Sequence, residues 1–269
     1  MTVIERHPFA VRLWHWITAA AVFVLLFTGV VVFNVHPRLY WGEVGNATMP
    51  AAIAIEAPPG ADLKAKPVPA IFRVGSHTWD LTGSVGLSVG GGEYFMIYRS
   101  PRYFMKFGAA RAYHFMAAWV FALSWVAYAV YLFTSRRLKR DLLPTSAQFT
   151  VRAFARDVWD HVRLRRAHGA AAGEYNLLQK LTYLAVVFIL VPVMALSGLT
   201  QSHAITARFP ELFTLFGGRE SARTIHGLTA ALFVVFILIH IFQLFVAGFI
   251  TKVRAMITGK LNISEQAST

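Results

Sequence analysis

Four of the ten histidines lie inside long stretches that contain no Asp, Glu, Lys or Arg: His15, His114, His226 and His240. An ionisable side chain in such a stretch is a functional hypothesis by default, because burying it in an apolar medium is costly. Imidazole is also the commonest protein ligand of metal ions. The four histidines are therefore candidate metal or haem ligands.

The stretches around these histidines predict membrane-spanning helices. The chain is 56% hydrophobic and 14% charged, about half the charged fraction of a soluble domain. An apolar run of about 20 residues can span a bilayer, where the backbone must be helical to satisfy its hydrogen bonds. Four runs qualify: 13–33, 112–133, 181–200 and 224–251. Pro192 lies within the third run and is expected to kink that helix.

Basic residues predict the orientation of the bundle. Arg6 and Arg12 precede the first run, and the connection 134–180 is densely basic. Positive charge accumulates on the cytoplasmic side of membrane proteins. We therefore expect both termini and the loop 134–180 on the inside, and the loop 34–111 outside.

The four histidines sort by depth into two pairs. His15 lies near the inner end of its run and His114 near the outer end of its own, whereas His226 and His240 lie near opposite ends of the last run. The last two are 14 residues apart, so they project within roughly 40° of each other and about 21 Å apart on a helix. The pattern predicts two stacked haem b groups, one held by His15 and His240 and one by His114 and His226. Bis-histidine ligation leaves iron no open position and favours electron transfer.

Arginine and glycine support these two sites. Arg12, Arg111 and Arg223 each precede a candidate ligand by three residues, one helical turn nearer the surface, where a haem propionate would need a cation. Gly29 follows His15 by 14 residues, so it faces the level of the outer pair and leaves room for a flat macrocycle. The alternatives are arginines that mark the ends of the spans and small residues that pack helices.

Composition excludes several other classes of site. The chain contains no cysteine, which rules out disulfides, thiolate-held iron–sulfur clusters and covalent haem attachment. The net charge is +13, and the basic residues that produce it lie between the apolar runs. This arrangement indicates contact with the membrane surface and not with nucleic acid. Histidines that pack helices in a haem-free scaffold or transporter remain the alternative from a different class.

Two loops carry further patterns. The outer loop contains four prolines between residues 58 and 69, then a Gly-rich stretch and the mixed aromatic and basic segment Tyr94–Phe107. That segment suits a membrane interface, a partner surface or an ordinary exposed loop. In the inner loop, roughly Ala147–Arg166 predicts an amphipathic basic helix, interpreted as a solvated segment attracted to anionic lipid.

The sequence resembles the bacterial cytochrome b561 and nickel-iron hydrogenase cytochrome b family, which includes the membrane subunits of formate dehydrogenase and thiosulfate reductase. The resemblance covers all four spans and is carried by His240 and by the following motifs: R-L-W-H-W at 12–16, T-G at 28–29, Y-N-L-L-Q-K at 175–180, S-G-L at 197–199 and G-G-R-E-S-A-R-T-I-H at 217–226. It implies an all-α four-helix transmembrane bundle in a bacterial inner membrane. It also implies the same assignment of the histidine pairs to two haems.

The resemblance further implies a quinone site and a partner. Quinone, the diffusible electron carrier, would bind beside the inner haem at Asn176, Gln179 and Lys180, although Asn176 also suits a helix N-cap. The segment His36–Glu43 looks like the thiosulfate-reductase branch, whose members pair with periplasmic molybdopterin oxidoreductases. The expected function is electron transfer between the quinone pool and such a partner; the alternative within the fold is a stand-alone quinol-oxidising cytochrome.

Overall fold

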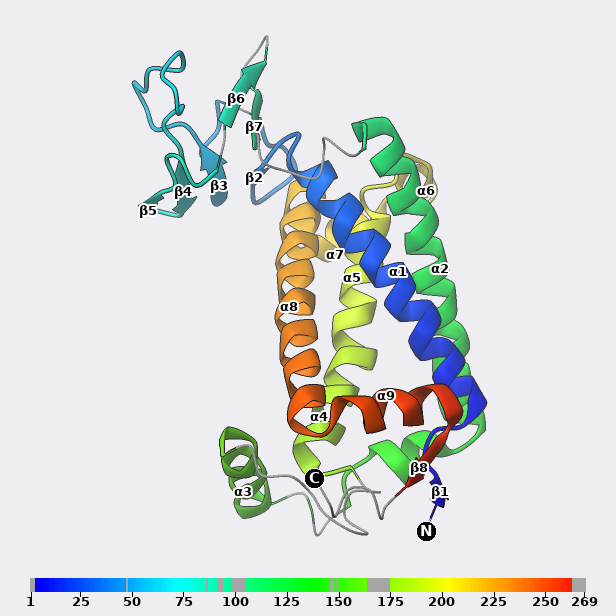
Figure 1. Cartoon of the computed structure of the whole chain (residues 1–269). Coiled ribbons are helices and arrows are strands. Elements are labelled where there is room, and N and C mark those ends of the chain that lie inside the picture. Colours follow the sequence, from blue (N-terminus) through cyan, green and yellow to red (C-terminus); the bar gives the residue numbers. More distant parts are fainter. Residues whose placement is uncertain are drawn as a thin grey trace. The chain divides into compact units, whose positions relative to one another are not determined.

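The computed structural model describes residues 3–46, 48–85, 87–90, 94–97, 105–145, 148, 150–163 and 175–262. The chain is mostly helical (Figure 1). Within the described residues, four helical segments are long and apolar enough to cross a membrane: Phe9–Phe33 (α1), Phe107–Thr134 (α2), Leu177–Leu199 (α4, η4 and α5) and Arg219–Val246 (α8). All four predicted spans are therefore helices, and each begins four or five residues earlier than the uncharged run did.

The earlier starts have a common cause. The first turns contain Arg12, Arg111, Lys180 and Arg223, which a search for uncharged runs excludes. Long basic side chains are tolerated at the end of a span because their charged heads reach the polar boundary.

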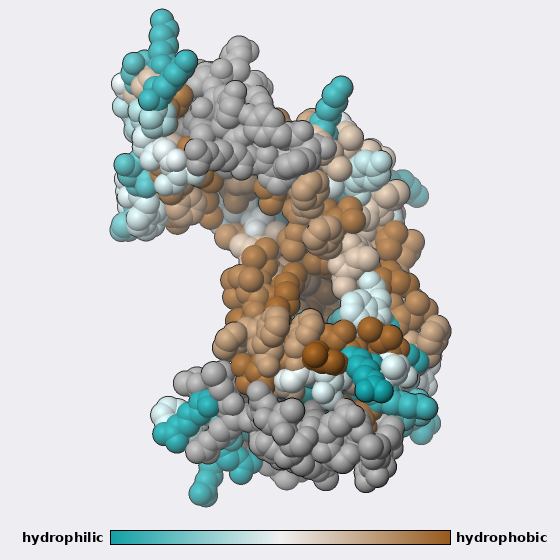
Figure 2. Space-filling model, in the orientation of Figure 1, coloured by the Kyte–Doolittle hydropathy of each residue, from teal (hydrophilic) through white to brown (hydrophobic). Residues whose placement is uncertain are grey.

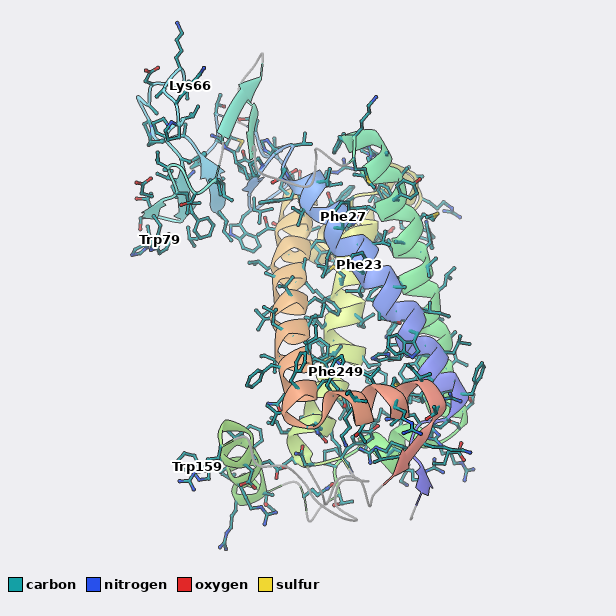
Figure 3. All side chains as sticks on the ribbon, in the orientation of Figure 1. Phe23, Phe27, Lys66, Trp79, Trp159 and Phe249 are labelled. Atoms are coloured by element: carbon teal, nitrogen blue, oxygen red, sulfur yellow. The ribbon has the colours of Figure 1, made fainter. Side chains whose placement is uncertain are left out.

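The helices present a hydrophobic outer surface. Large apolar side chains on them are exposed, among them Phe23, which is 74% exposed on α1, and Leu123, 61% exposed on α2. Figure 2 shows brown, hydrophobic side chains along the helices, and Figure 3 labels Phe23. Exposed apolar surface on this scale is stable in contact with lipid chains and unfavourable in water.

The chain divides into two compact units. The first unit comprises residues 1–19, 121–192 and 232–269, and the second comprises residues 20–120 and 193–231. Each unit contains one part of every long helix. Each unit can therefore build a site from several helices by itself.

The third helix contains a π-helical turn where the sequence predicted a kink. α4 (Leu177–Ala185) continues through η4 (Val186–Leu190) into α5 (Val191–Leu199). The Val191 N–H donates to the Val186 carbonyl, five residues back. The next donor in this pattern would be Pro192, which has no N–H. Trp125 of α2 supplies the donor instead, its Nε1 lying 2.7 Å from the Val187 carbonyl oxygen.

The last helix ends earlier than the predicted limit of residue 251. α8 stops at Val246, and Gly248 adopts a left-handed conformation with φ of 92° before α9 (Phe249–Thr258) begins. Only glycine reaches this conformation without a steric penalty. After α9, β8 (Lys260–Asn262) pairs antiparallel with β1 (Val3–Glu5) in the first unit.

The loop after α1 forms strands that the sequence reading did not predict. Its strands pair antiparallel in the order β2 (Arg38–Leu39), β3 (Ile53–Glu56), β4 (Ile71–Val74) and β5 (His77–Asp80). The buried Glu56 carboxylate joins Arg38 and Arg73, each at 2.8 Å. A separate hairpin pairs β6 (Leu87–Gly90) with β7 (Tyr94–Ile97).

Of the patterned loop segments, only parts are described. β7 covers the start of the segment Tyr94–Phe107, and residues 98–104 lie outside the described residues. The predicted basic helix is α3 (Val151–Val162), whereas residues 147, 149 and 164–166 lie outside the described residues. The remaining elements are η2 (Leu138–Leu142), α6 (His203–Arg208) and α7 (Glu211–Phe216).

Candidate functional site: two histidine pairs

The structure brings the four histidines together in two pairs. In the second unit, the rings of His114 on α2 and His226 on α8 have centroids 6.3 Å apart. In the first unit, His15 on α1 and His240 on α8 have centroids 6.4 Å apart. The pairs are those that depth in the sequence predicted.

The distance between the two ring centroids of each pair matches the distance expected when one metal atom is bound between the two imidazoles. A metal–nitrogen bond of about 2.0 Å on each side, plus about 1.2 Å from nitrogen to ring centre, requires roughly 6.4 Å between ring centres. A direct hydrogen bond between the rings would bring the centres closer. The donor set is two imidazoles in an apolar setting, which suits haem iron.

Hydroxyl groups orient the histidines of the second unit. Thr28 Oγ1 on α1 lies 3.0 Å from His114 Nδ1, and Ser197 Oγ on α5 lies 3.2 Å from His226 Nδ1. His226 Nδ1 is also 3.2 Å from the Met194 carbonyl oxygen. With Nδ1 engaged on each ring, Nε2 is the nitrogen left for a metal.

A glycine follows each hydroxyl residue and contacts the same histidine. A Cβ at Gly29 would lie 3.4 Å from His114 Cε1, and one at Gly198 would lie 3.1 Å from His226 Cε1. A side chain at Gly198 would therefore displace the ring. Gly227, which directly follows His226, packs against Leu39 instead. A Cβ at Gly227 would lie 3.3 Å from Leu39 Cδ1.

The histidines of the first unit are held differently. His15 Nδ1 is buried and has no hydrogen-bond partner among the described residues. The His240 ring stacks on Phe236, with centroids 5.8 Å apart and planes 21° apart. Next to His15 in the sequence, Trp14 stacks on Tyr128 of α2 at 3.8 Å, which fixes this end of α1.

The three arginines that precede the ligands differ in their contacts. Arg12 donates to the Ile257 carbonyl, and its Nε is buried with no partner among the described residues. Arg111 lies over the ring of Phe115, 5.7 Å from its centroid. Arg223 donates to the His36 carbonyl at 2.7 Å and pairs with Glu220 at 3.3 Å. Arg12 thus offers a propionate an unused donor, whereas Arg223 already orders the chain around it.

The segment that follows α1 docks on the N-terminus of α8. The Gly42 carbonyl accepts from the N–H groups of Glu220 and Ser221, at 3.1 and 3.0 Å. In return the Gly42 N–H donates to Ser221 Oγ at 2.7 Å. The first N–H groups of a helix have no partner within it, so these contacts both cap α8 and fix the position of His226, about one and a half turns further on. Gly218 makes the approach possible, because a Cβ there would overlap the Gly42 carbonyl.

Two histidines outside the spans are neutral at physiological pH. Burial, reinforced by the nearby Arg6, lowers the pKa of His7 to about 4. Burial, reinforced by Arg223 and Arg38, likewise lowers the pKa of His36 to about 4. The His36 ring stacks on that of Tyr40, with centroids 5.7 Å apart.

The three residues predicted to bind quinone lie together at the start of α4. Asn176 Oδ1 accepts from the Gln179 N–H at 2.8 Å, and Gln179 Oε1 accepts from the Asn176 N–H at 3.3 Å. This is a reciprocal capping box. Lys180 is buried and donates to Gln148 Oε1 at 3.0 Å and to the Leu143 carbonyl at 3.4 Å. The caps use the amide oxygens, so a quinone carbonyl would have to engage the amide nitrogens.

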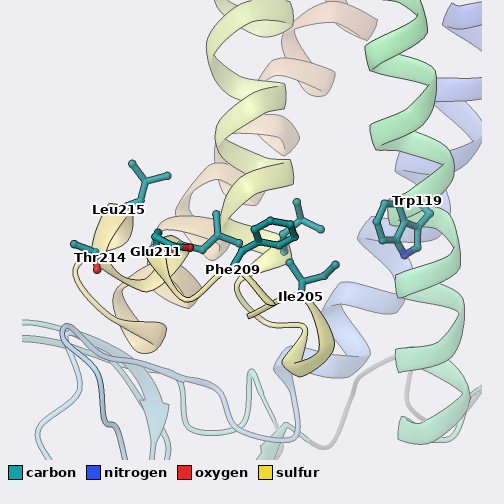
Figure 4. A pocket seen from close by; sticks show the side chains of 8 residues that line it. Trp119, Ile205, Phe209, Glu211, Thr214 and Leu215 are labelled. Atoms are coloured by element: carbon teal, nitrogen blue, oxygen red, sulfur yellow. The ribbon is translucent and has the colours of Figure 1, made fainter. Parts of the chain in front are cut away.

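The second unit also carries an apolar groove of about 860 Å³ (Figure 4). Trp119 of α2 lies on one side of it, and α6, α7 and the chain between them lie on the other. Trp119 is five residues after His114, and Leu199 directly follows Gly198. The lining is apolar apart from two polar side chains: Trp119, Leu199, Ile205, Phe209, Glu211, Leu212, Thr214 and Leu215.

Thr28 and Ser197 are the site residues that sequence reasoning missed. The pairs Thr28–Gly29 and Ser197–Gly198 were visible as motifs. A signal was present, because a hydroxyl next to a glycine recurs in two of the four apolar runs. Which histidine each would contact depends on how the helices are rotated, and one sequence does not give that rotation.

Four apolar helices, three of which hold histidines in facing pairs, are typical of a membrane cytochrome of the b type. The chain belongs to the prokaryotic cytochrome b561 family, whose model matches residues 6–259. The predicted family is thereby confirmed, and with it the haem, electron-transport and transmembrane character of the protein.

A curated relative matches part of the chain. It is the putative protein-methionine-sulfoxide reductase subunit YedZ1 of Azospira oryzae, 32% identical over 134 residues. The match covers 50% of this chain and 64% of the relative.

Proposed function

We propose that this cytochrome b holds two haem b groups and transfers electrons between the quinone pool and an oxidoreductase on the outer side of a bacterial inner membrane. The observation that carries the proposal is the pair of ring separations, 6.3 and 6.4 Å, in two separate units. Two sites of the same kind, each with one histidine from α8, suit transfer across a bilayer. Both termini would lie in the cytoplasm, with the loop 134–180.

The chain's own residues would bind and orient the cofactors. His15 with His240, and His114 with His226, would bind the haem iron, and the haem would supply reversible one-electron chemistry. Gly29 and Gly198 leave room at the ligands of the second unit. Arg12, with its unpartnered buried Nε, is the arginine best suited to a propionate. Arg111 and Arg223 remain weaker candidates for that role.

We place the quinone beside the inner pair, at Asn176, Gln179 and Lys180. The buried ammonium of Lys180 is the strongest support, because a buried cation can stabilise reduced oxygens and exchange protons. The partner would be of the molybdopterin type, as in the branch that the segment His36–Glu43 resembles. The relative whose name designates a reductase subunit supports the assignment to a multi-subunit reductase.

Haem counting tests the proposal. The purified chain should contain two b-type haems by pyridine haemochrome assay, and His226→Ala and His240→Ala should each retain one, with different midpoint potentials. His77→Ala, on the exposed strand β5, is the matched control and should retain two. If all four single alanine variants at the paired histidines retained two haems, the ligand assignment would be wrong.

The groove of the second unit favours a second candidate, a stand-alone quinol-oxidising cytochrome. Its apolar walls suit an isoprenoid chain, and Glu211 supplies a carboxyl group among them. Co-purification with a soluble oxidoreductase would speak for the first function. Quinol-dependent haem reduction that Glu211→Gln abolishes and Lys180→Met leaves intact would speak for the second.

A further inference from the structure

The geometry points to Thr28 and Ser197 as positioning residues that accept hydrogen bonds from the axial histidines of the second unit and thereby lower the reduction potential of the haem held there. This inference rests on the proposed ligation of haem by His114 and His226. It concerns how strongly those ligands donate electrons to iron.

The direction of the two hydrogen bonds follows from the hydroxyl groups. Thr28 Oγ1 lies 2.7 Å from the Val24 carbonyl oxygen, and Ser197 Oγ lies 2.6 Å from the Val193 carbonyl oxygen. A carbonyl can only accept, so each hydroxyl gives its one proton to the turn below. The hydroxyl oxygen then faces the imidazole with a lone pair, and the imidazole must donate from Nδ1. Both histidines are thereby fixed in the tautomer whose Nε2 carries a lone pair.

The buried hydroxyl groups of Thr28 and Ser197 already have a hydrogen-bond partner without the histidines. A serine or threonine within a helix is already satisfied by the carbonyl four residues back. Both residues are fully buried, with an exposed fraction of 0%. What each adds is an acceptor aimed at the next helix, and an acceptor on Nδ1–H makes the other ring nitrogen a stronger base. A stronger axial base stabilises ferric over ferrous iron, which lowers the potential.

The first unit lacks the counterpart of this arrangement among its described residues. His15 Nδ1 has no acceptor there, and His240 contacts an aromatic ring, that of Phe236. The two sites of one chain therefore differ in the polarity around their ligands. Removing the hydroxyls should move only one of the two potentials.

A spectroelectrochemical titration of the full-length holoprotein tests this inference. Thr28→Val and Ser197→Ala remove the hydroxyl acceptor with little change of volume, while the Met194 carbonyl stays 3.2 Å from His226 Nδ1. Each variant should raise the midpoint potential of one haem and leave the other unchanged, and the rise should be smaller for Ser197→Ala because that carbonyl remains. The haem that responds should be the one retained in His240→Ala. Thr229→Val is the matched control: Thr229 is buried, its hydroxyl donates to the Ile225 carbonyl four residues back at 2.7 Å, and among the described residues it has no hydrogen bond to a histidine.

Several outcomes would overturn the inference. Unchanged potentials with two haems bound, a downward shift, or equal shifts of both haems would each contradict it. If a variant loses haem, Thr28→Ser and Ser197→Thr, which keep the acceptor, must bind two haems at the wild-type potentials; if they do not, the hydroxyl is not the cause. A wild-type chain without two haems would instead refute the proposed function.

Discussion

Each histidine of the second unit is met by two consecutive residues of another helix, a hydroxyl residue that accepts from Nδ1 and a glycine that leaves room for the ring. The sequence predicted the histidines because they are the exceptional residues in apolar runs. It predicted Gly29 because a 14-residue spacing preserves the helix face. Thr28 and Ser197 escaped prediction because a buried hydroxyl in a membrane helix is common and usually bonds to its own backbone.

Gly218 gives a residue-scale prediction about the docking of the segment His36–Gly42. Gly218→Ala combines a left-handed φ of 115° with overlap against the Gly42 carbonyl, and its hypothetical Cβ lies 2.7 Å from the Glu43 nitrogen. Gly60→Ala shares the left-handed backbone, with φ of 74°, and has nothing within 4 Å. Both should lose about 1–2 kcal/mol from the backbone penalty, and Gly218→Ala should lose more because the overlap adds to it. Thermal unfolding in detergent measures both, and equal losses would show that the close approach is not needed.

At the scale of elements, the third helix shows what periodicity cannot give. Pro192 correctly marked a departure from α-helical geometry, but proline alone does not say whether the helix bends or shifts to five-residue hydrogen bonding. The outcome depends on Trp125 in another helix, which satisfies the Val187 carbonyl. The strands of the loop 34–111 were missed for a similar reason. They are short, and their pairing joins residues as distant as Arg38 and Ala54.

The hydrogen bond from Trp125 to the Val187 carbonyl gives a prediction at the scale of elements. Trp125→Phe leaves the buried Val187 carbonyl unpaired and should lower the free energy of unfolding by about 1–3 kcal/mol. Adding Pro192→Ala restores an N–H that can donate to that carbonyl, so the double variant should recover part of the loss. Chemical denaturation in mixed micelles measures the cycle, with Trp119→Phe, at a half-exposed position, as the control. Strictly additive losses would show that the residues are not coupled through this carbonyl.

At the scale of the whole chain, the first unit contains contacts between residues near the N-terminus and residues 256–262. Arg12 donates to the Ile257 carbonyl, Trp16 to the Met256 carbonyl at 3.3 Å, and β1 pairs with β8. All these contacts lie in the unit that holds His15 and His240. The sequence indicated the four spans and the depth of the histidines. It did not indicate that the chain after Gly248 folds back as a separate helix and strand.

Ending the chain after Gly248 should therefore act on one site only. The truncated protein loses α9 and β8, so we expect it to fall from two haems to one and to keep the midpoint potential assigned to the His114–His226 site. Ending the chain after Asn262 is the control and should leave two haems bound. Loss of both haems on the shorter truncation would contradict the independence of the two units.

The paired hydroxyl and glycine next to each histidine of the second unit also amount to a transferable design rule. One histidine on a helix, faced by Ser-Gly or Thr-Gly on another, needs three residues and no charged group to hold an imidazole in a chosen tautomer. This three-residue arrangement, here called a histidine socket, could be built into an artificial apolar bundle at any depth where two helices approach closely. Replacing the hydroxyl residue with valine or alanine would then give a set of otherwise identical sockets that differ in electron affinity.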